Sequence, residues 1–262
     1  MKLIKKIIGF VLVILLLCIA LFVWNGHRDY KKAVEGMSIE EKVEEIRTKD
    51  TYTKYEELPE IYIDAVICAE DHRFNLHNGV DVFAVIRATF NNIKQKTFAE
   101  GGSTITQQLA KNLYFEQDKN FTRKFAEMFV AFDIEKLYSK KEILEIYVNC
   151  IYFGNNCYGV QQASNYYFGV EPKDMNDYQS TMLAGIPNAP SLYNPVESEG
   201  LAKERQRQIL EKMVKNKKLS EEKAESILDY TVDIEVKNRL DGFFNGIKKS
   251  AKKAVVDILL EE

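Results

Sequence analysis

The stretch from 101 to 112 contains residue types that point to chemistry, because it sets uncharged polar side chains and one lysine on a short amphipathic helix pattern. Thr104 followed by Gln107 has the spacing of a capping box at a helix start. Thr104, Gln108 and Lys111 fall on one face of the predicted helix. Backbone N–H groups at a helix start and an ammonium group about two turns later suit a phosphate or a sugar hydroxyl. This face predicts a polar ligand, although a solvated helix face fits the pattern equally well.

Two carboxylates indicate acid–base chemistry. Glu70 ends an apolar helix pattern, where the negative end of the helix dipole and partial burial disfavour its charged form, as suits a general base. It opens the polar cluster 70–77, although most Glu-Asp pairs are solvated helix ends. Glu127 follows Arg123 by one helical turn in a strongly apolar segment. This second pair is either part of an active site or, as is more frequent, a structural ion pair.

Several other kinds of site have no pattern in this sequence. No His/Cys cluster has zinc spacing, and no glycine-rich dinucleotide or P-loop pattern occurs, so we expect no organic cofactor. The formal net charge of −3 gives no reason to expect a nucleic-acid partner. Four cysteines are too few for a disulfide framework in 262 residues. A bridge between Cys150 and Cys157 is conceivable, but free thiols are the expected state.

An uninterrupted apolar run from 7 to 24 follows three lysines, Lys2, Lys5 and Lys6. About 18 residues suffice to cross a bilayer. The run ends in large side chains rather than the small ones of a cleavage site, so a retained anchor is favoured over a signal peptide. The lysines place the N-terminus in the cytoplasm and the rest of the chain outside it, although basic residues at 28–32 weaken this bias.

The sequence after the apolar run predicts a protein that is almost entirely helical. Apolar residues recur at helical spacing in successive segments, and prolines and glycines gather between these segments. Capping patterns at Ser38 and Ser139, and Pro59 at a helix start, indicate three of the boundaries. We expect helices at 38–47, 59–71, 82–96, 104–114, 122–137, 139–149, 178–184, 202–215 and 221–229. The polar segment 48–57 is expected to be a linker. The segment 152–169, rich in aromatic residues and glycines, shows no clear helical period.

Five groups of residues resemble, in order, the five motifs of the peptidoglycan glycosyltransferases, glycosyltransferase family 51. They are 70–81, 101–112, the set Arg123, Lys124 and Glu127 with 139–149, 152–169, and 183–195. Five ordered matches between about 58 and 213 are far more specific than a single pattern. The resemblance implies a lysozyme-like, all-α domain of two lobes, with a larger head, a smaller membrane-facing jaw and a cleft between them.

The resemblance implies an enzyme that polymerises lipid II into β-1,4-linked glycan strands of bacterial peptidoglycan and releases undecaprenyl pyrophosphate. Glu70 would be the general base that takes the proton of the acceptor's 4-hydroxyl, and a single displacement would invert the anomeric centre. Lys111 and Arg123 would neutralise the donor pyrophosphate. Glu127 would be the second essential acid, orienting donor groups or helping to hold a divalent cation, Mg²⁺ or Mn²⁺.

The other residues that the resemblance assigns to substrate binding are Asp71, Phe74, His77, Thr104, Gln108, Asn112 and, as a weaker phosphate contact, Lys140. The expected partners are lipid II, the lipid-linked glycan strand, the cell membrane and the cell-wall synthesis machinery. A single-pass protein of the bacterial plasma membrane follows, with its catalytic domain extracytoplasmic. The apolar stretch 82–86, close to Phe90 and Phe98, is the expected contact with lipid.

Two positions depart from the family pattern. His72 stands where arginine is common, and Glu100 stands where glutamine is common, which adds a negative charge beside the expected pyrophosphate site. The tail 231–262 lies beyond the matching residues. An amphipathic helix on anionic lipid is one interpretation of this tail, and a charged tail in solvent fits it better.

The sequence thus divides into a cytoplasmic tail (1–6), a transmembrane anchor (7–24), an extracytoplasmic linker and helix (25–57), a glycosyltransferase domain (58–230) and a charged tail (231–262). Two other functions stay open. A lysozyme-like lytic hydrolase would share the fold and the leading acid, but would not need cations for a pyrophosphate. A non-catalytic scaffold that binds lipid-linked precursors would need neither acid. We expect no transpeptidase, because too few residues follow the fifth motif.

Overall fold

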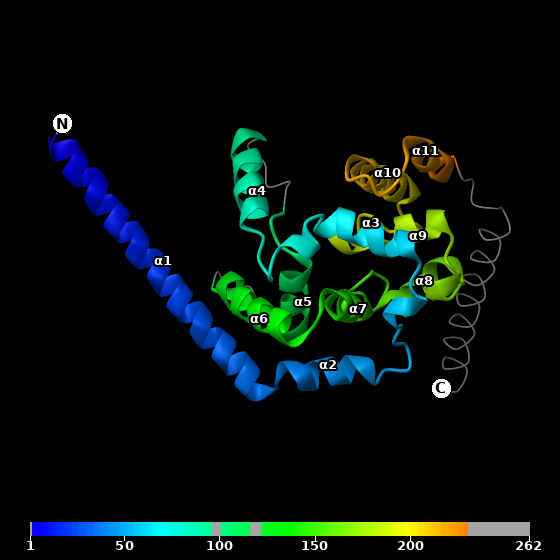
Figure 1. The fold of residues 1–262 in the computed structure, drawn as a ribbon, viewed down its shortest axis with the longest axis horizontal. Helices are drawn as coiled ribbons and strands as arrows, with labels where there is room; N and C mark the ends of the chain where they lie inside the picture. The colour runs from blue at the N-terminus through cyan, green and yellow to red at the C-terminus, as the bar shows by residue number, and fades with distance from the viewer. Residues whose placement is uncertain (1, 96–100, 116–121, 230–262) are drawn as a thin grey trace, which may run out of the picture.

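The computed structural model describes residues 2–95, 101–115 and 122–229 of the chain (Figure 1). Within these ranges all regular structure is helical, apart from an isolated antiparallel bridge between Tyr152 and Tyr158. The predicted all-α class is therefore confirmed. The expectations for Phe98, Glu100 and the tail 231–262 lie outside the described residues.

Helix boundaries lie within a few residues of the predicted ones where a side chain caps the helix. Ser38, Thr104 and Ser139 each accept a hydrogen bond from the backbone three residues on, and the side chain there bonds back. The α-helices are α1 (Lys2–Gly36), α2 (Ile39–Arg47), α3 (Glu60–Glu70), α4 (Val82–Gln95), α5 (Ile105–Tyr114), α6 (Arg123–Leu137), α7 (Lys140–Cys150), α8 (Val160–Phe168), α9 (Asp177–Leu183), α10 (Glu199–Lys215) and α11 (Glu221–Leu228). Short 3₁₀ helices are η1 (Tyr55–Glu57), η2 (Phe74–Leu76), η3 (Pro172–Asp174) and η4 (Ile186–Asn188).

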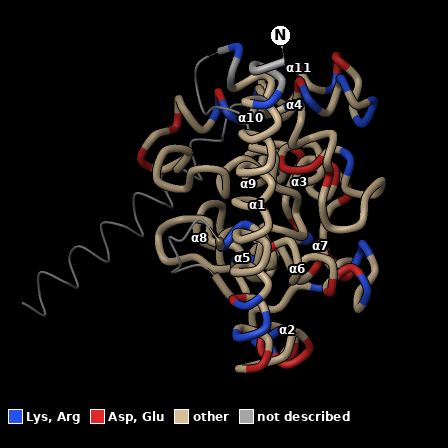
Figure 2. The backbone as a smooth tube through the Cα atoms, turned by 90° about the vertical axis from the view of Figure 1, so that its left-hand side faces the viewer, with Lys and Arg blue, Asp and Glu red and all other residues tan. Residues whose placement is uncertain are grey.

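The first helix, α1, extends beyond the apolar run that predicts it. Its residues 9–36 are long and apolar enough to cross a membrane, with a mean hydropathy of 2.5 in the most apolar part. Figure 1 shows α1 running obliquely away from the other helices, and in Figure 2 its apolar length is free of charged residues. Because α1 continues to Gly36, residues 25–36 are helical.

The C-terminal part of α1 packs against α6. Gly26 permits the close approach, since a Cβ atom there would lie 2.4 Å from the Cβ atom of Phe125. The rings of Phe22 and Phe125 stack with their centroids 6.3 Å apart. Thr122, just before α6, donates from Oγ1 to a carboxylate oxygen of Asp29 at 2.7 Å. The apolar helix and the rest of the protein are therefore joined by direct packing.

The prediction missed α8, which lies between two glycines. Gly159 precedes the helix with a φ of 87°, and Gly169 ends it in the left-handed conformation with a φ of 68°. A Cβ atom at Gly159 would lie 2.7 Å from the carbonyl oxygen of Asn149, so no larger residue fits there without a shift. The helix is short and places large aromatic residues such as Tyr167 in the core, which conceals its period in the sequence.

The second half of the segment 48–57, predicted as a linker, is held against α7. The backbone N–H of Thr53 donates to Asn149 Oδ1 at 2.8 Å, and Asn149 Nδ2 donates back to the carbonyl oxygen of Thr53 at 2.7 Å. The backbone N–H of Tyr55, at the start of η1, donates to Glu145 at 2.6 Å. The buried side chain of Asn149 thus fixes this polar connection to α7.

The core lies where α3, α5, α7, α9 and α10 meet. Its large fully buried side chains include Tyr62, Tyr147, Ile105 and Leu109. Helix α4 behaves differently, because Val82, Phe83, Ile86 and Phe90 are each at least 60% exposed. In Figure 1 α4 stands apart from the core helices.

Candidate active site

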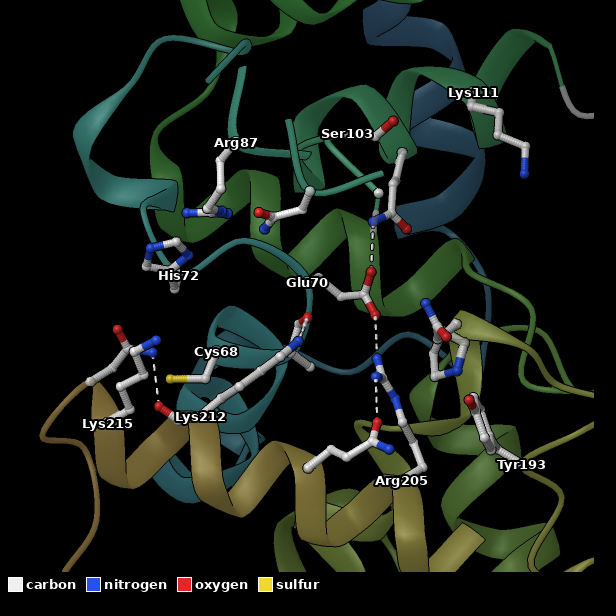
Figure 3. A pocket seen from close by; sticks show the side chains of 18 of the residues that line it. Cys68, Glu70, His72, Arg87, Ser103, Lys111, Tyr193, Arg205, Lys212 and Lys215 are labelled. Carbon is white, nitrogen blue, oxygen red and sulfur yellow. Dashed lines mark hydrogen bonds and ion pairs between the residues drawn. The ribbon is translucent and has the colours of Figure 1, made fainter. Parts of the chain in front are cut away.

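A cavity of about 720 Å³ opens between α3, α4, α5, α6 and α10 (Figure 3). Its lining is strongly cationic, and Glu70 is the single carboxylate residue in it among the described parts of the chain. The lining residues are Cys68, Ala69, Glu70, His72, Arg87, Asn91, Gly101, Ser103, Gln108, Lys111, Arg123, Lys124, Pro187, Asn188, Tyr193, Arg205, Gln208, Lys212, Lys215 and Asn216. One acid among many cations suits a ligand with phosphate groups and a hydroxyl that must lose a proton.

Glu70 is the last residue of α3, and its two carboxylate oxygens have different surroundings. Oε2 accepts a hydrogen bond from Gln108 Nε2 at 2.7 Å. Oε1 is buried without a hydrogen bond within the described residues and lies 3.9 Å from a guanidinium nitrogen of Arg205. Figure 3 shows the carboxylate between these two contacts. One oxygen is thus held in place by a hydrogen bond, while the other makes none and faces the guanidinium group of Arg205.

A group of cations from α5 and α6 lies on one side of the cavity. Lys111 comes from α5, and Arg123 and Lys124 come from the first turn of α6. Glu127 lies beneath the last two, fully buried, with Arg123 Nε 3.0 Å from Oε1 and Lys124 Nζ 2.5 Å from Oε2. The predicted Arg123–Glu127 ion pair is therefore present, and Lys124 joins it. The buried acid holds both cations at the wall of the cavity.

A second group of basic side chains comes mainly from α10. Arg205 has a side chain that is only 10% exposed and lies 5.6 Å from the ring centroid of Tyr193. Lys212 donates from Nζ to the carbonyl oxygen of Ala69 at 2.9 Å, beside Glu70. Across the cavity, burial and the nearby charge of Arg87 lower the pKa of His72, so His72 is neutral at pH 7.

Asp71, Phe74 and His77 lie outside the cavity lining. Asp71 Oδ2 is 2.9 Å from His77 Nε2 and accepts from the backbone N–H of Ile105 at 3.2 Å. Phe74 is 1% exposed and packs edge-on against the ring of His77. These residues tie the end of α3 to the start of α5. In this arrangement they set the positions of Glu70 and Gln108 and do not contact the cavity.

The predicted ligand face of α5 is divided. Gln108 and Lys111 reach the cavity, whereas Thr104 is 1% exposed and serves as the helix cap. The Thr104 hydroxyl also donates to the carbonyl oxygen of Gly79 at 2.5 Å. Asn112 is half-buried and does not line the cavity.

Lys140, the weaker candidate for a phosphate contact, is engaged elsewhere in the structure. Its Nζ donates to the carbonyl oxygen of His77 at 2.7 Å and pairs with Glu135 at 2.7 Å. The same ammonium lies 4.4 Å from the ring centroid of Phe74. Thr106 of α5 also donates to Glu135, at 2.6 Å. Lys140 therefore links the start of α7 to the segment after Glu70.

The contribution of α10 to the cavity is not among the predictions from sequence, which give only a helix at 202–215. Arg205, Gln208, Lys212 and Lys215 recur at intervals of three or four residues and so share one face. The apolar residues Ala202, Ile209 and Met213 lie on another side of the helix and pack into the protein core. The missing information was which other element this helix faces, and that depends on the tertiary fold.

Within the described ranges, no group of three or more His, Cys, Asp or Glu side chains lies close enough to hold a metal ion. Both oxygens of Glu127 already face cations. The described residues therefore do not provide a metal site made of protein ligands alone. The divalent cation stays a prediction. The four cysteines are free, as predicted. Burial raises the pKa of the Cys68 thiol to about 11, which leaves it uncharged at the cavity wall.

Comparison with known proteins agrees with the resemblance seen in the sequence. The model of the transglycosylase family matches residues 36–214. Penicillin-binding protein 1A of Neisseria lactamica is 44% identical over 178 residues, 68% of this chain and 22% of that protein. Penicillin-binding protein 1F of Bacillus subtilis is 42% identical over 183 residues, 70% of this chain and 26% of that protein.

The helical fold and a basic cavity with one acid among the described residues that line it define a lysozyme-like domain suited to transfer chemistry. The chain belongs to the transglycosylase family. It spans about a quarter of the length of the curated relatives it matches.

Proposed function

We propose that the protein is a peptidoglycan glycosyltransferase that polymerises lipid II into β-1,4-linked glycan strands during bacterial cell-wall synthesis. The observation that carries this proposal is the position of Glu70, which lines a cationic cavity and whose Oε1 makes no hydrogen bond within the described residues. The family match over 36–214 supports the same class of reaction. A substrate with a sugar hydroxyl and a pyrophosphate fits both features, the hydroxyl at the carboxylate and the phosphates at the cations.

In the proposed reaction, Glu70 Oε1 takes the proton from the 4-hydroxyl of the acceptor N-acetylglucosamine. The electron pair of that oxygen forms the new bond to the anomeric carbon of the donor's terminal N-acetylmuramic acid. The bond from this carbon to the pyrophosphate oxygen breaks, and its electron pair leaves with undecaprenyl pyrophosphate. Because attack and departure occur on opposite faces, the α-linked donor becomes a β-1,4 linkage.

Lys111, Arg123 and Lys124 stabilise the charge that builds up on the departing pyrophosphate. Glu127 acts through two of these cations, since its oxygens hold Arg123 and Lys124 in place. A divalent cation would add positive charge on the same side. It would have to be held largely by substrate oxygens, because the nearby acid is already paired.

We infer that α1 anchors the protein in the bacterial plasma membrane by a single pass, with the N-terminus in the cytoplasm and the catalytic domain outside. The apolar length of α1 and the lysines that precede it support this topology. Figures 1 and 2 both place α4 on the same side of the core as the N-terminal half of α1. The exposed apolar residues of α4 would therefore meet the same bilayer, where the substrate's lipid resides. The lipid-linked strand and the cell-wall synthesis machinery are the further partners that we propose.

The test is to incubate the purified full chain with lipid II, with and without a divalent cation, and in parallel with isolated peptidoglycan. We expect glycan polymer from lipid II and no solubilisation of peptidoglycan. Solubilisation without polymer would identify a lytic hydrolase instead. Binding of lipid II with neither reaction would identify a scaffold and would overturn the proposal.

A further inference from the structure

Tyr147, on α7, lies directly behind the candidate base. Its side chain is fully buried, and its hydroxyl donates to Gln108 Oε1 at 3.1 Å. The other end of that amide, Nε2, donates to Glu70 Oε2 at 2.7 Å. The three side chains therefore form a row of hydrogen bonds that runs from the protein core to the edge of the cavity.

The orientation of the Gln108 amide decides what Glu70 meets, because one end of an amide donates and the other accepts. With Nε2 toward Glu70, the amide stabilises the carboxylate anion. Rotated by half a turn, the amide would present Oε1 to the carboxylate, and two acceptors in contact repel each other unless Glu70 carries a proton.

The Tyr147 hydroxyl is well suited to select the first orientation. Burial, with a further contribution from the charge of Glu70, raises the pKa of Tyr147 well above its ordinary value. The hydroxyl therefore keeps its proton. Gln108 Oε1 is stabilised where it can accept that proton's hydrogen bond, and this leaves Nε2 for Glu70.

We propose that Tyr147 is a positioning residue for the base, whose hydroxyl holds the Gln108 amide in the orientation that donates to Glu70. This keeps Oε2 occupied and fixes the orientation of the carboxylate at the cavity wall. The inference rests on the proposed role of Glu70 as general base. It assigns Tyr147 no contact with substrate, because Tyr147 is fully buried and does not line the cavity.

Other charged groups face Glu70 from every element around it and also influence its ionisation. Arg205 of α10 is 3.9 Å away, and Asp71, the next residue in the chain, is bonded to His77. The cavity wall adds His72, Arg87, Lys111, Arg123, Lys124, Lys212, Lys215 and the thiol of Cys68. All of these are unchanged when the Tyr147 hydroxyl alone is removed, so the pH dependence of that variant reports on the hydrogen-bonded row.

The first experiment measures polymerisation of lipid II against pH for Tyr147→Phe. Losing the fixed donor disfavours the ionised base, so the midpoint of the acid limb should rise by about one pH unit. The rate well below the midpoint should then fall roughly tenfold, while the rate at high pH stays near that of the wild type. An equal loss at every pH would indicate a purely structural role and would contradict the proposal.

Tyr62→Phe is the matched control. Tyr62 is equally buried and lies on the same helix as Glu70, but its hydroxyl makes no hydrogen bond within the described residues. Tyr62→Phe should therefore leave the midpoint of the acid limb unchanged.

Gln108→Leu removes the amide itself. Because Tyr147 acts through Gln108, adding Tyr147→Phe to Gln108→Leu should move the midpoint no further, and additive shifts would overturn the row of hydrogen bonds.

A ¹³C NMR titration of the Glu70 carboxyl carbon, assigned by comparison with Glu70→Gln, measures the same shift without substrate. If the wild type does not polymerise lipid II but Tyr147→Phe moves the titration of Glu70, the proposed function fails and the role of Tyr147 stands. If the wild type polymerises lipid II and the titration of Glu70 is the same in Tyr147→Phe, the role of Tyr147 is wrong and the proposed function stands.

Discussion

Glu70 combines two features that a general base needs, a fixed orientation and a free lone pair. Gln108 holds one carboxylate oxygen, and the other makes no hydrogen bond within the described residues and lies near Arg205. The same residue at a solvated helix end would have neither the fixed geometry nor the confined space.

Glu70→Gln keeps the size and the hydrogen bond to Gln108 but removes the basic lone pair. We expect polymerisation of lipid II to fall by at least about 100-fold while the thermal midpoint changes little. Asp64→Asn, on the same helix, is the control; it weakens only a partly exposed ion pair with Lys218 and should leave the rate nearly unchanged. Retention of more than about a tenth of the wild-type rate by Glu70→Gln would refute the assignment.

Lys111→Met retains most of the side-chain length and deletes the charge. If Lys111 contacts a phosphate, donor use should weaken by about 1.5 to 3 kcal/mol. The family resemblance suggests that moenomycin, a phosphoglycolipid, occupies the same cleft, so its binding should weaken in parallel. Lys203→Met is a control, since Lys203 pairs with Glu199 at the surface. A slower reaction with unchanged moenomycin affinity would mean that Lys111 has another role.

At the scale of elements, α4 is the helix whose exposed side chains need an explanation. Phe83 and Phe90 are 70% and 67% exposed, and Val82 and Ile86 are nearly as open. Large exposed apolar residues that cluster on one helix mark a surface that contacts another protein or a membrane. We propose that the α4 surface contacts the lipid bilayer.

Replacing both Phe83 and Phe90 with Asp should separate the domain from lipid. A form that lacks residues 1–24 should co-sediment with anionic liposomes, and the double variant of that form should lose most of this binding, because each buried aromatic side chain contributes about 1.5 to 3 kcal/mol. Leu201→Asp, a change at an exposed apolar residue on α10, should not alter binding. Equal co-sedimentation of all three proteins would exclude α4 as the lipid contact.

Sequence reasoning located helices where side chains carry explicit start signals. Ser38, Thr104 and Ser139 cap the helices that their spacing predicts, and Arg123 lies one turn from Glu127 as expected. Sequence reasoning failed for α8, because two glycines enclose a helix too short and too aromatic to show its period. A helix was therefore predicted where its capping residues or its apolar period are visible in the sequence, and it was missed where they are not.

The candidate site was predictable only in part, for a related reason. The sequence pointed to Glu70, Gln108 and Lys111, and the structure places all three at the cavity. It could not show that Thr104 and Lys140 turn inward, nor that Arg205 approaches Glu70 from a helix more than a hundred residues later. Those facts depend on which helices meet, and helical periodicity carries no information about partners.

For the whole molecule, the long apolar helix and the cavity belong to one packed arrangement. α1 rests on α6 through Phe125 and the Thr122–Asp29 hydrogen bond, and α6 carries Arg123 and Lys124 at the cavity wall. A membrane anchor joined in this way would hold the proposed pyrophosphate side of the cavity at a set distance from the bilayer. This suits a substrate whose lipid remains in the membrane while its sugars react.

The most direct test of the central claim is the product formed by the full chain in liposomes that contain lipid II. The account predicts β-1,4-linked glycan that still carries a lipid pyrophosphate at one end, with one undecaprenyl pyrophosphate released for each bond formed. Glu70→Gln in the same liposomes should form almost none. Free sugar chains released by hydrolysis, α-linked product, or equal polymer from wild type and Glu70→Gln would contradict the account.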